Sequence, residues 1–271
     1  PSRNALQVRR PSFELPDLPH YWFGGDAFAT HYMNALSSVF PDGEAFFVRS
    51  VQRYRDRIQE PELLRAIQGF AGQEAQHSHQ HDFHLELLVA QGYTGLVRGN
   101  RVADRIMRLE NRHLPRFSLA STAAVEHLTA LLARRILADD ARFTALMDPR
   151  MAALWRWHSV EEAEHKAVAF DVLQEVAPSR ALRAFALALN SVGLFVEMLA
   201  RTLYMLAKDG VLFRRATLAS GWRFLFGREG LLRGHGHSYL AWYRRGFHPA
   251  QIDDSPLIAA WGDRIGVSTT S

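Results

Sequence analysis

The chain has 271 residues, of which 48% are hydrophobic and 22% charged, so it has enough apolar mass to bury a large core. It contains no cysteine, which excludes disulfides, cysteine nucleophiles and thiolate ligands and leaves nitrogen and oxygen donors for a metal. A cytoplasmic location fits that composition. The formal charge is +4, but residues 201–250 hold nine Lys or Arg against two acids, Asp209 and Glu229.

Apolar residues recur at helical spacing and almost never alternate with a period of two, so we expect an all-α protein. Residues 1–24 contain an arginine pair with no apolar stretch behind it, and we expect an N-terminal arm rather than an export signal. Residues 25–178 contain four long stretches of helical periodicity and predict a four-helix bundle. The four helices are expected at residues 42–58, 61–92, 116–139 and 148–178.

The remaining residues, 179–271, predict a helical C-terminal extension packed on the bundle. The beginning of this extension is the most apolar part of the chain, but Asn190, Glu197 and Arg201 interrupt it. We therefore expect a buried helix that covers the bundle rather than a membrane span. Helix is expected at residues 179–208 and 211–245, before an irregular end.

The segment "WHSVEEAEHKAVAFD", residues 157–171, places several polar residues in a helix with the composition of a buried one. At about 100° per residue, His158, Glu162 and His165 fall within about 60° of one another around the helix axis. One narrow stripe therefore carries all three side chains, and a single bound group could contact them together.

The other predicted helices supply matching residues. Glu74 and His77 are three positions apart on one helix face, and Glu44 and Glu126 are lone glutamates in the apolar runs of the other two helices. The order Glu, E-x-x-H, Glu, E-x-x-H is the ligand pattern of a carboxylate-bridged dinuclear metal site inside a four-helix bundle. Four buried carboxylates would repel one another strongly, whereas two divalent cations would neutralise them.

A single E-x-x-H pair is weak evidence, because about one is expected by chance in a chain of this composition. A third pair, Glu110 and His113, lies among arginines just before a proline, and we expect it at a solvated surface turn. The alternative for the other two pairs is a set of hydrogen-bonded core residues without a metal. Near the predicted ligands, His81 and Glu161 are candidates for a second shell that orients them.

The spacing H-x-x-x-E-x-x-H at residues 158–165 resembles that of the ferritin-like diiron N-oxygenases, typified by p-aminobenzoate N-oxygenase. In that family one iron has an added histidine. The resemblance implies a ferritin-like bundle with seven metal ligands, which in this sequence are Glu44, Glu74, His77, Glu126, His158, Glu162 and His165.

Nearly the whole chain also resembles bacterial proteins described as predicted metal-dependent hydrolases. It is carried by the blocks "FPDGEAFF", "QEAQHSHQH", "HSVEEAEHKAVAFDV" and "YLAWYRRGFHP". This resemblance implies a metal-dependent enzyme but does not identify its substrate.

Three functions are compatible with such a site. Histidine and carboxylate ligands suit two Fe ions, with Mn or a mixed Fe/Mn pair as alternatives. Our first interpretation is an oxygenase that uses dioxygen as co-substrate, a small nonpolar or amine substrate, and an electron donor protein or other reductant. The alternatives are a dimetal hydrolase that activates water and a metal-storage protein without catalysis.

The sequence suggests few macromolecular partners. The basic, aromatic segment 213–234 raises the alternative that residues 201–250 make a peripheral contact with the inner membrane. No nucleic acid partner is expected, because the basic excess accompanies apolar residues and no known binding motif. If the protein forms an oligomer, we expect a homodimer.

Overall fold

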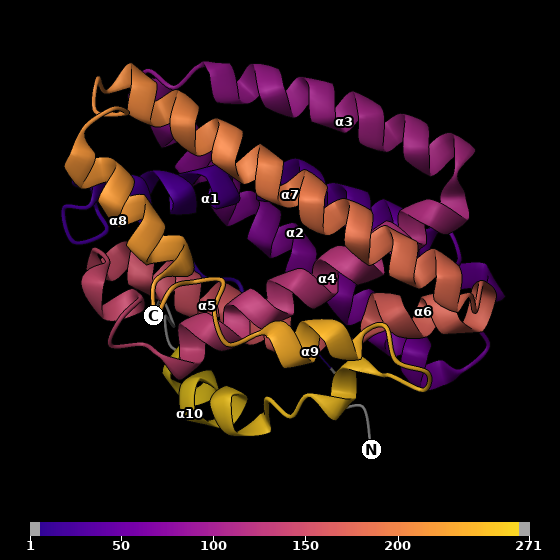
Figure 1. Ribbon diagram of the computed structural model, residues 1–271. Coiled ribbons are helices and arrows are strands. Elements are labelled where there is room, and N and C mark those ends of the chain that lie inside the picture. Colours follow the sequence, from indigo (N-terminus) through magenta and orange to yellow (C-terminus); the bar gives the residue numbers. More distant parts are fainter. Residues whose placement is uncertain (1–5, 266–271) are drawn as a thin grey trace.

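The computed structural model describes residues 6–265, whose regular secondary structure is helical, without a strand beyond an isolated bridge between Phe23 and Met147. The prediction of an all-α protein is therefore confirmed (Figure 1). The α-helices are α1 (Ala27–Gln52), α2 (Pro61–Ala90), α3 (Gly95–His113), α4 (Pro115–Ala138), α5 (Pro149–His165), α6 (Val168–Val176), α7 (Arg180–Lys208), α8 (Arg215–Phe226), α9 (Gly236–Ala241) and α10 (Ser255–Ile265).

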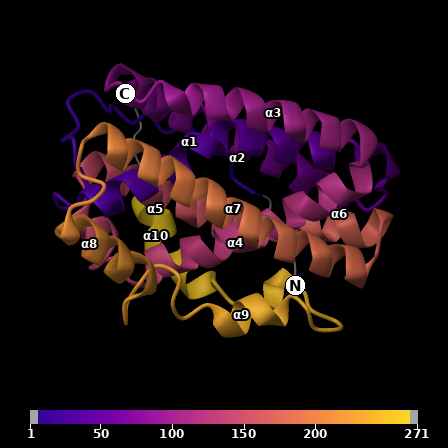
Figure 2. The same cartoon turned by 45° about the horizontal axis from the view of Figure 1, so that its top comes forward.

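Helices α1, α2, α4 and α5 form the centre of the molecule. Helix α1 packs on α2 and α4, and α5 packs on the same two helices, so the four surround a common interior. Helices α3 and α7 lie over one side of this group, α8 follows at the end of α7, and α9 and α10 lie on the opposite side (Figures 1 and 2). The division into an arm, a bundle and an extension stays a prediction, since α7 packs extensively on α1 and α4.

Helix α1 is much longer than the sequence predicts. We expected its start near Asp42, but the side chain of Asp26 accepts a hydrogen bond from the amide of Ala29 and caps a helix that begins at Ala27. Pro41 lies inside this helix, where the sequence pattern indicated a boundary. The helix also ends at Gln52 rather than near residue 58, and a short 3₁₀ turn follows.

The structure corrects three further boundaries. The stretch predicted as one helix over 148–178 is two helices, and the turn between them holds Lys166, whose ammonium group binds Asp254 and the carbonyl of Ile252. Only parts of 211–245 are helical, namely α8 and α9, whereas the end that we predicted as irregular contains α10. Helix α3 was not predicted, because most of its 19 residues are polar or glycine.

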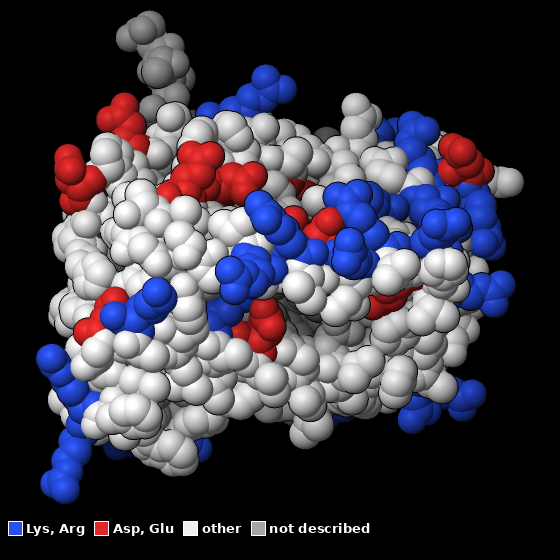
Figure 3. Space-filling model, turned by 90° about the horizontal axis from the view of Figure 1, so that it is seen from above, with Lys and Arg blue, Asp and Glu red and all other residues white. Residues whose placement is uncertain are grey.

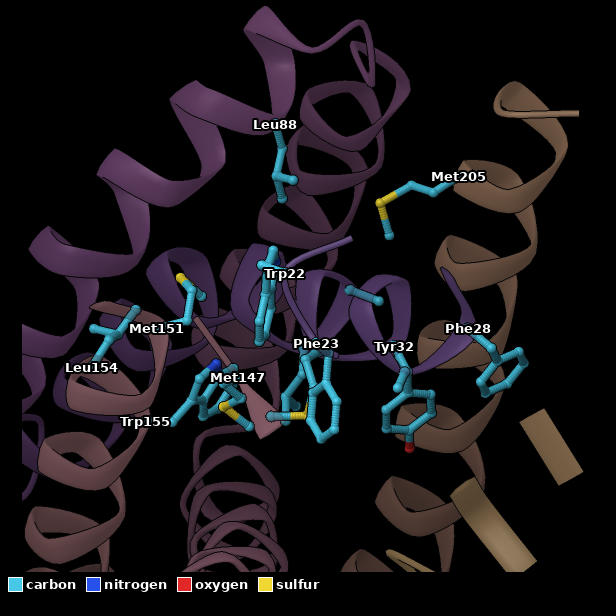
Figure 4. Packing of buried hydrophobic residues seen from close by; sticks show 14 of the residues in the cluster. Trp22, Phe23, Phe28, Tyr32, Leu88, Met147, Met151, Leu154, Trp155 and Met205 are labelled. Atoms are coloured by element: carbon cyan, nitrogen blue, oxygen red, sulfur yellow. The ribbon is translucent and has the colours of Figure 1, made fainter. Parts of the chain in front are cut away.

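The N-terminal arm contributes to the core. Trp22 and Phe23, each 4% exposed, lie among side chains from several helices (Figure 4). The indole N–H of Trp22 donates to Oδ1 of Asn34, 2.8 Å away, which joins the arm to α1. A large aromatic side chain of this kind buries about 150–250 Å² and stabilises the segment that carries it. The arm is therefore an integral part of the fold.

Asp209, just after α7, joins four segments. It accepts hydrogen bonds from the hydroxyl groups of Tyr21 and Tyr93 at 2.9 and 2.7 Å, and its Oδ2 lies 2.8 Å from Nε2 of both His20 and His31. Burial raises the pKa of Asp209, but these hydrogen bonds outweigh it and lower the pKa to about 2. The arm, α1, the start of α3 and the end of α7 are thereby tied to one carboxylate.

We predict that Asp209→Ala lowers the melting temperature by about 2–10 °C, because an unsatisfied buried partner costs about 1–3 kcal/mol and 1 kcal/mol shifts Tm by about 2–4 °C. Calorimetry at pH 7 would measure this, with the exposed Asp56→Ala as control. The folded pKa of about 2 lies below the ordinary 3.8, so the stabilisation is present above pH 4 and lost as pH falls toward 2. The difference in Tm between wild type and variant should shrink from pH 5 to pH 3, and a constant difference would contradict this role.

Candidate metal centre

The seven residues predicted as metal ligands meet in the interior of the four central helices. Each is at most 3% exposed. Helix α1 contributes one of them, α2 two, α4 one and α5 three, in the order that the sequence indicated. They are Glu44, Glu74, His77, Glu126, His158, Glu162 and His165. The structure thus brings all seven together, and their role as ligands stays a prediction.

The seven side chains form two adjoining groups. Glu44, His77 and His158 offer nitrogen and oxygen atoms that all lie within 4.8 Å of one another. Glu74, Glu162 and His165 form a second group of the same size. Within each group the donor atoms are close enough for one cation to contact all three, so the two groups together could bind two cations.

Glu126 joins the second group through His165, whose Nε2 lies 3.3 Å from Oε2 of Glu126 and 3.1 Å from Oε1 of Glu74. Glu162 lies between the two groups. Its Oε1 is 3.2 Å from Nε2 of His158 and 3.6 Å from Nε2 of His165. A carboxylate in this position is placed to bridge two cations.

Each of the three histidines uses one ring nitrogen to contact a polar group outside the cluster. Nε2 of His77 lies 3.1 Å from Oε2 of Glu161, and Nδ1 of His165 lies 3.0 Å from Oε1 of Gln73. Both oxygens are acceptors, so each histidine carries a proton on that side and turns its other nitrogen toward the cluster. Burial lowers the pKa of His165, but Glu126 and Glu162 outweigh it and raise the pKa well above the ordinary value. Second groups of this kind orient histidine ligands in metal sites.

The third histidine, His158, is held by other histidines. Its Nδ1 lies 2.9 Å from Nε2 of His81, and Nδ1 of His81 lies 2.7 Å from the hydroxyl of Ser37. That hydroxyl also contacts Nδ1 of His84 at 2.7 Å. Burial lowers the pKa of His84 to about 3, so this ring is neutral. The two candidates for a second shell, His81 and Glu161, therefore both contact predicted ligands.

Two residues of this surrounding layer were not predicted. Gln73 is four positions from His77 and faces the same way, so its position on the polar stripe of α2 could have identified it as a neighbour of the cluster. Arg9 comes from the arm and pairs with Glu161 at 3.1 Å and with Glu164 at 2.7 Å. No local pattern in the sequence indicates that contact. Glu164 is consequently held in an ion pair with the arm.

The pKa values in the cluster indicate that its carboxylates lack compensating positive charge. Burial, together with repulsion from neighbouring carboxylates, raises the pKa of Glu44 and Glu74 well above the ordinary value. Burial also raises the pKa of Glu126, to about 7. For Glu162 burial acts in the same direction, but His165 and His158 outweigh it and lower the pKa. Ionised carboxylates at this depth need more positive charge than three histidines provide.

The hydrogen bonds of the cluster also leave several of its polar atoms without partners. Ser78 donates to Oε2 of Glu44 at 2.9 Å, and Thr129 donates to Glu162. Many other buried polar atoms of the cluster have no hydrogen-bond partner, which is rare and costly for a folded protein. They are Oε1 of Glu44, both carboxylate oxygens of Glu74 and of Glu126, Nδ1 of His77, and Nε2 of His158 and His165. Divalent cations would satisfy these donors and neutralise the carboxylates, so the residues fit two metal ions.

Two other groups with metal-binding residue types do not belong to this centre. Glu110 and His113 lie on the last turn of α3, where His113 is exposed while burial raises the pKa of Glu110, so the prediction of a solvated surface turn was wrong for the glutamate. His20, His31 and Asp209 form a third cluster.

That third cluster is a hydrogen-bond network rather than a cation site. Because Trp22 donates to Oδ1 of Asn34, the amide nitrogen of Asn34 faces Nδ1 of His31 at 3.4 Å and donates to it. His31 therefore carries its proton on Nε2 and donates it to Asp209, 2.8 Å away. A cation would need the lone pair at that nitrogen.

Comparison with known proteins bears on this centre. Residues 7–253 match the model of a family described as predicted metal-dependent hydrolase. The chain belongs to this family. No curated protein and no solved structure gave a significant match. The family match supports a metal-dependent hydrolase, while the predicted relationship to diiron oxygenases receives no support from it.

We predict that the wild-type protein binds about two divalent ions per chain and that Glu74→Ala retains one or fewer, because both oxygens of Glu74 face the cluster without another partner. The loss of counter-charge should also lower the melting temperature. Metal analysis by mass spectrometry would test this, with Glu86→Ala, an exposed glutamate of the same helix, as control. Full metal content in Glu74→Ala would refute the assignment.

We also predict that Gln73→Leu weakens metal affinity by about 10- to 100-fold, because His165 loses the acceptor that fixes its proton on Nδ1. Competition with a chelating dye would measure the affinity. Gln73 also donates to the carbonyl of Gln7 in the arm and to Glu164, so Gln80→Leu, which removes two hydrogen bonds with the arm and none with a predicted ligand, is the control. Equal losses of affinity in the two variants would show that the arm, not the histidine, is responsible.

Proposed function

We propose that this protein is a dimetal-dependent hydrolase whose metal centre lies inside a ferritin-like bundle of α1, α2, α4 and α5. The family match supports the reaction class. The observation that supports the centre is the convergence of buried donor atoms without hydrogen-bond partners, contributed by all four helices. When bound, a pair of divalent cations supplies Lewis-acid activation of an acyl or phosphoryl group and lowers the pKa of a water molecule.

The residues of the chain have distinct tasks in such a centre. Glu44, Glu74 and Glu126 supply negative charge from three helices, and Glu162 lies where it contacts both groups. Glu161 and Gln73 hold the histidines in one tautomer, so that the free lone pairs face the cluster. A site whose ligands are fixed in advance loses little free energy to reorganisation during a reaction.

Aromatic side chains enclose the centre. The ring centroids of Phe40 and His158 lie 4.5 Å apart, and those of Trp157 and His77 lie 4.8 Å apart. Phe70 contacts His165 in an edge-on geometry at 5.1 Å. These rings exclude water from the ligands, which strengthens their electrostatic interactions. Such surroundings favour an uncharged or weakly polar ester as the substrate over a strongly charged one.

The same enclosure supports a second candidate, a diiron oxygenase with dioxygen as co-substrate and an external electron donor. The specific observation is His158, whose Nε2 faces the cluster beside Glu162 and adds a third nitrogen donor to a set that otherwise has the six ligands of a plain dinuclear carboxylate site. Nitrogen and carboxylate donors without thiolate suit iron or manganese. A nonpolar or amine substrate would fit the aromatic walls.

One pair of assays separates the two candidates. We predict that protein loaded with zinc or manganese hydrolyses 4-nitrophenyl acetate at least about tenfold faster than Glu74→Ala, equally well with and without air. The parallel assay measures oxygen consumption by protein loaded with ferrous iron in the presence of a reductant. Hydrolysis that ignores air, together with oxygen consumption no faster than that of Glu74→Ala, would support the hydrolase. Oxygen consumption that requires Glu74, with no hydrolysis by the zinc form, would contradict the hydrolase and support the oxygenase.

A further inference from the structure

The outer face of α7 is apolar along most of its length. Between positions 185 and 200, over about 22 Å at 1.5 Å per residue, the outer face of this helix carries one charged side chain, Glu197, which is 46% exposed and pairs with Arg201 at 2.7 Å; the other exposed residues are nonpolar. The large ones are spaced by four, three and four positions and are about half to two-thirds exposed. These exposed residues are Phe185, Ala188, Leu189, Val192, Gly193, Val196 and Ala200.

We expected α7 to be buried, and the structure corrects this. Within residues 6–265, α7 is the one helix long and apolar enough to cross a membrane by length and composition, and 22% of its most apolar stretch is buried. Its inner face carries Arg183 and Arg201, which are 5% and 6% exposed and bind other segments of the protein. Since this face packs on α1 and α4, α7 lies along the protein surface rather than spanning a bilayer.

Helix α8 continues the apolar surface. Leu218, Trp222 and Phe226 are 51%, 66% and 38% exposed and are spaced by four residues, so they share one face. The ring of Phe226 lies 6.4 Å from that of Phe195 on α7, which joins the two faces. Phe213, before α8, is 87% exposed. Exposed apolar surface of this extent is typical of an interaction site.

Arginines border this surface on the α3 side. The start of α3 contacts the last turns of α7, where the amide of Gly95 donates to the hydroxyl of Tyr204 at 2.9 Å. Every charged residue exposed on α3 before its last residue, His113, is an arginine, with Val102 and Ile106 exposed between them. The exposed arginines are Arg98, Arg101, Arg105, Arg108 and Arg112. Figure 3 shows Lys and Arg gathered beside a broad uncharged area on this side of the molecule.

We propose that α7, α8 and α3 form a docking surface for an anionic lipid bilayer, with the apolar face of α7 lying in the plane of the interface. Apolar side chains of interfacial helices enter the boundary between headgroups and acyl chains, while arginines bind the lipid phosphates. Trp222 suits the same region, because its ring is apolar and its indole N–H is polar. Helix α8 adds Arg214, Arg215 and Arg223, all exposed.

A second copy of the chain fits this surface less well. A two-fold contact through α7 would bring the arginines of both copies close together. Residues 210–228 contain no acid, and the two acids of α3, Asp104 and Glu110, are only partly exposed. Asp104 already pairs with Arg108 at 2.6 Å. The like charges would therefore repel one another, whereas anionic headgroups neutralise them.

We predict that the purified protein co-floats with phosphatidylcholine vesicles containing about one-third phosphatidylglycerol at low salt, and binds pure phosphatidylcholine at least about tenfold more weakly. The double variant Arg98→Gln and Arg105→Gln should weaken binding to the anionic vesicles by about tenfold or more. Arg55→Gln with Arg65→Gln, exposed arginines outside this surface, is the matched control and should bind like wild type.

The apolar part of the surface has its own test. Val192→Glu should weaken vesicle binding by about tenfold or more without changing the melting temperature, since Val192 is 64% exposed. Leu146→Glu, at an exposed leucine remote in sequence from these helices, is the control. Equal binding to both kinds of vesicle, or unchanged binding in both surface variants, would overturn the proposal. Loss of a wild-type dimer in Val192→Glu, measured by sedimentation and without vesicle binding by wild type, would overturn it in favour of a second copy.

Discussion

The burial of four carboxylates in one small volume is the constraint on which the rest of this structure depends. Moving an ionised carboxylate out of water costs several kcal/mol unless opposite charge and hydrogen bonds replace the lost hydration. The three histidines and two hydroxyl donors of the cluster replace only part of it, because both oxygens of Glu74 and of Glu126 remain without a hydrogen-bond partner. The cluster therefore lacks positive charge that added cations would supply, and the match to a family of predicted metal-dependent hydrolases is consistent with that.

Much of the surrounding structure serves to hold this cluster in place. Gln73 and Glu161 orient two of the histidines, and Arg9 supplies the positive charge that Glu161 needs at the edge of the centre. The arm that brings Arg9 is fixed in turn by Trp22 in the core and by the contacts of Asp209. Segments far apart in the sequence thus depend on one another through buried polar groups, each of which is costly to leave unsatisfied.

The sequence predicted the cluster better than it predicted the helices. Spacing of three and four places residues on one face wherever the helix begins or ends, so His158, Glu162 and His165 were found together although the helix predicted over 148–178 is two helices. The start of α1 was missed because Pro41 usually marks a boundary, and only the surrounding packing allows it inside a helix. Arg9 could not have been predicted, because its partners lie more than 150 residues away and no local period relates them.

The proposed docking surface and the candidate metal centre are connected through one stretch of α1. From the inner face of α7, Nη1 of Arg201 donates to the hydroxyl of Ser38 at 3.0 Å, next to Ser37, whose hydroxyl contacts His81. His81 in turn contacts His158. Because α7 is fixed to α1 by these buried bonds, a bilayer bound to its outer face would lie at a set distance from the metal centre. A weakly polar substrate dissolved in that bilayer would then be concentrated on the side of the protein from which α7 and α3 cover the bundle.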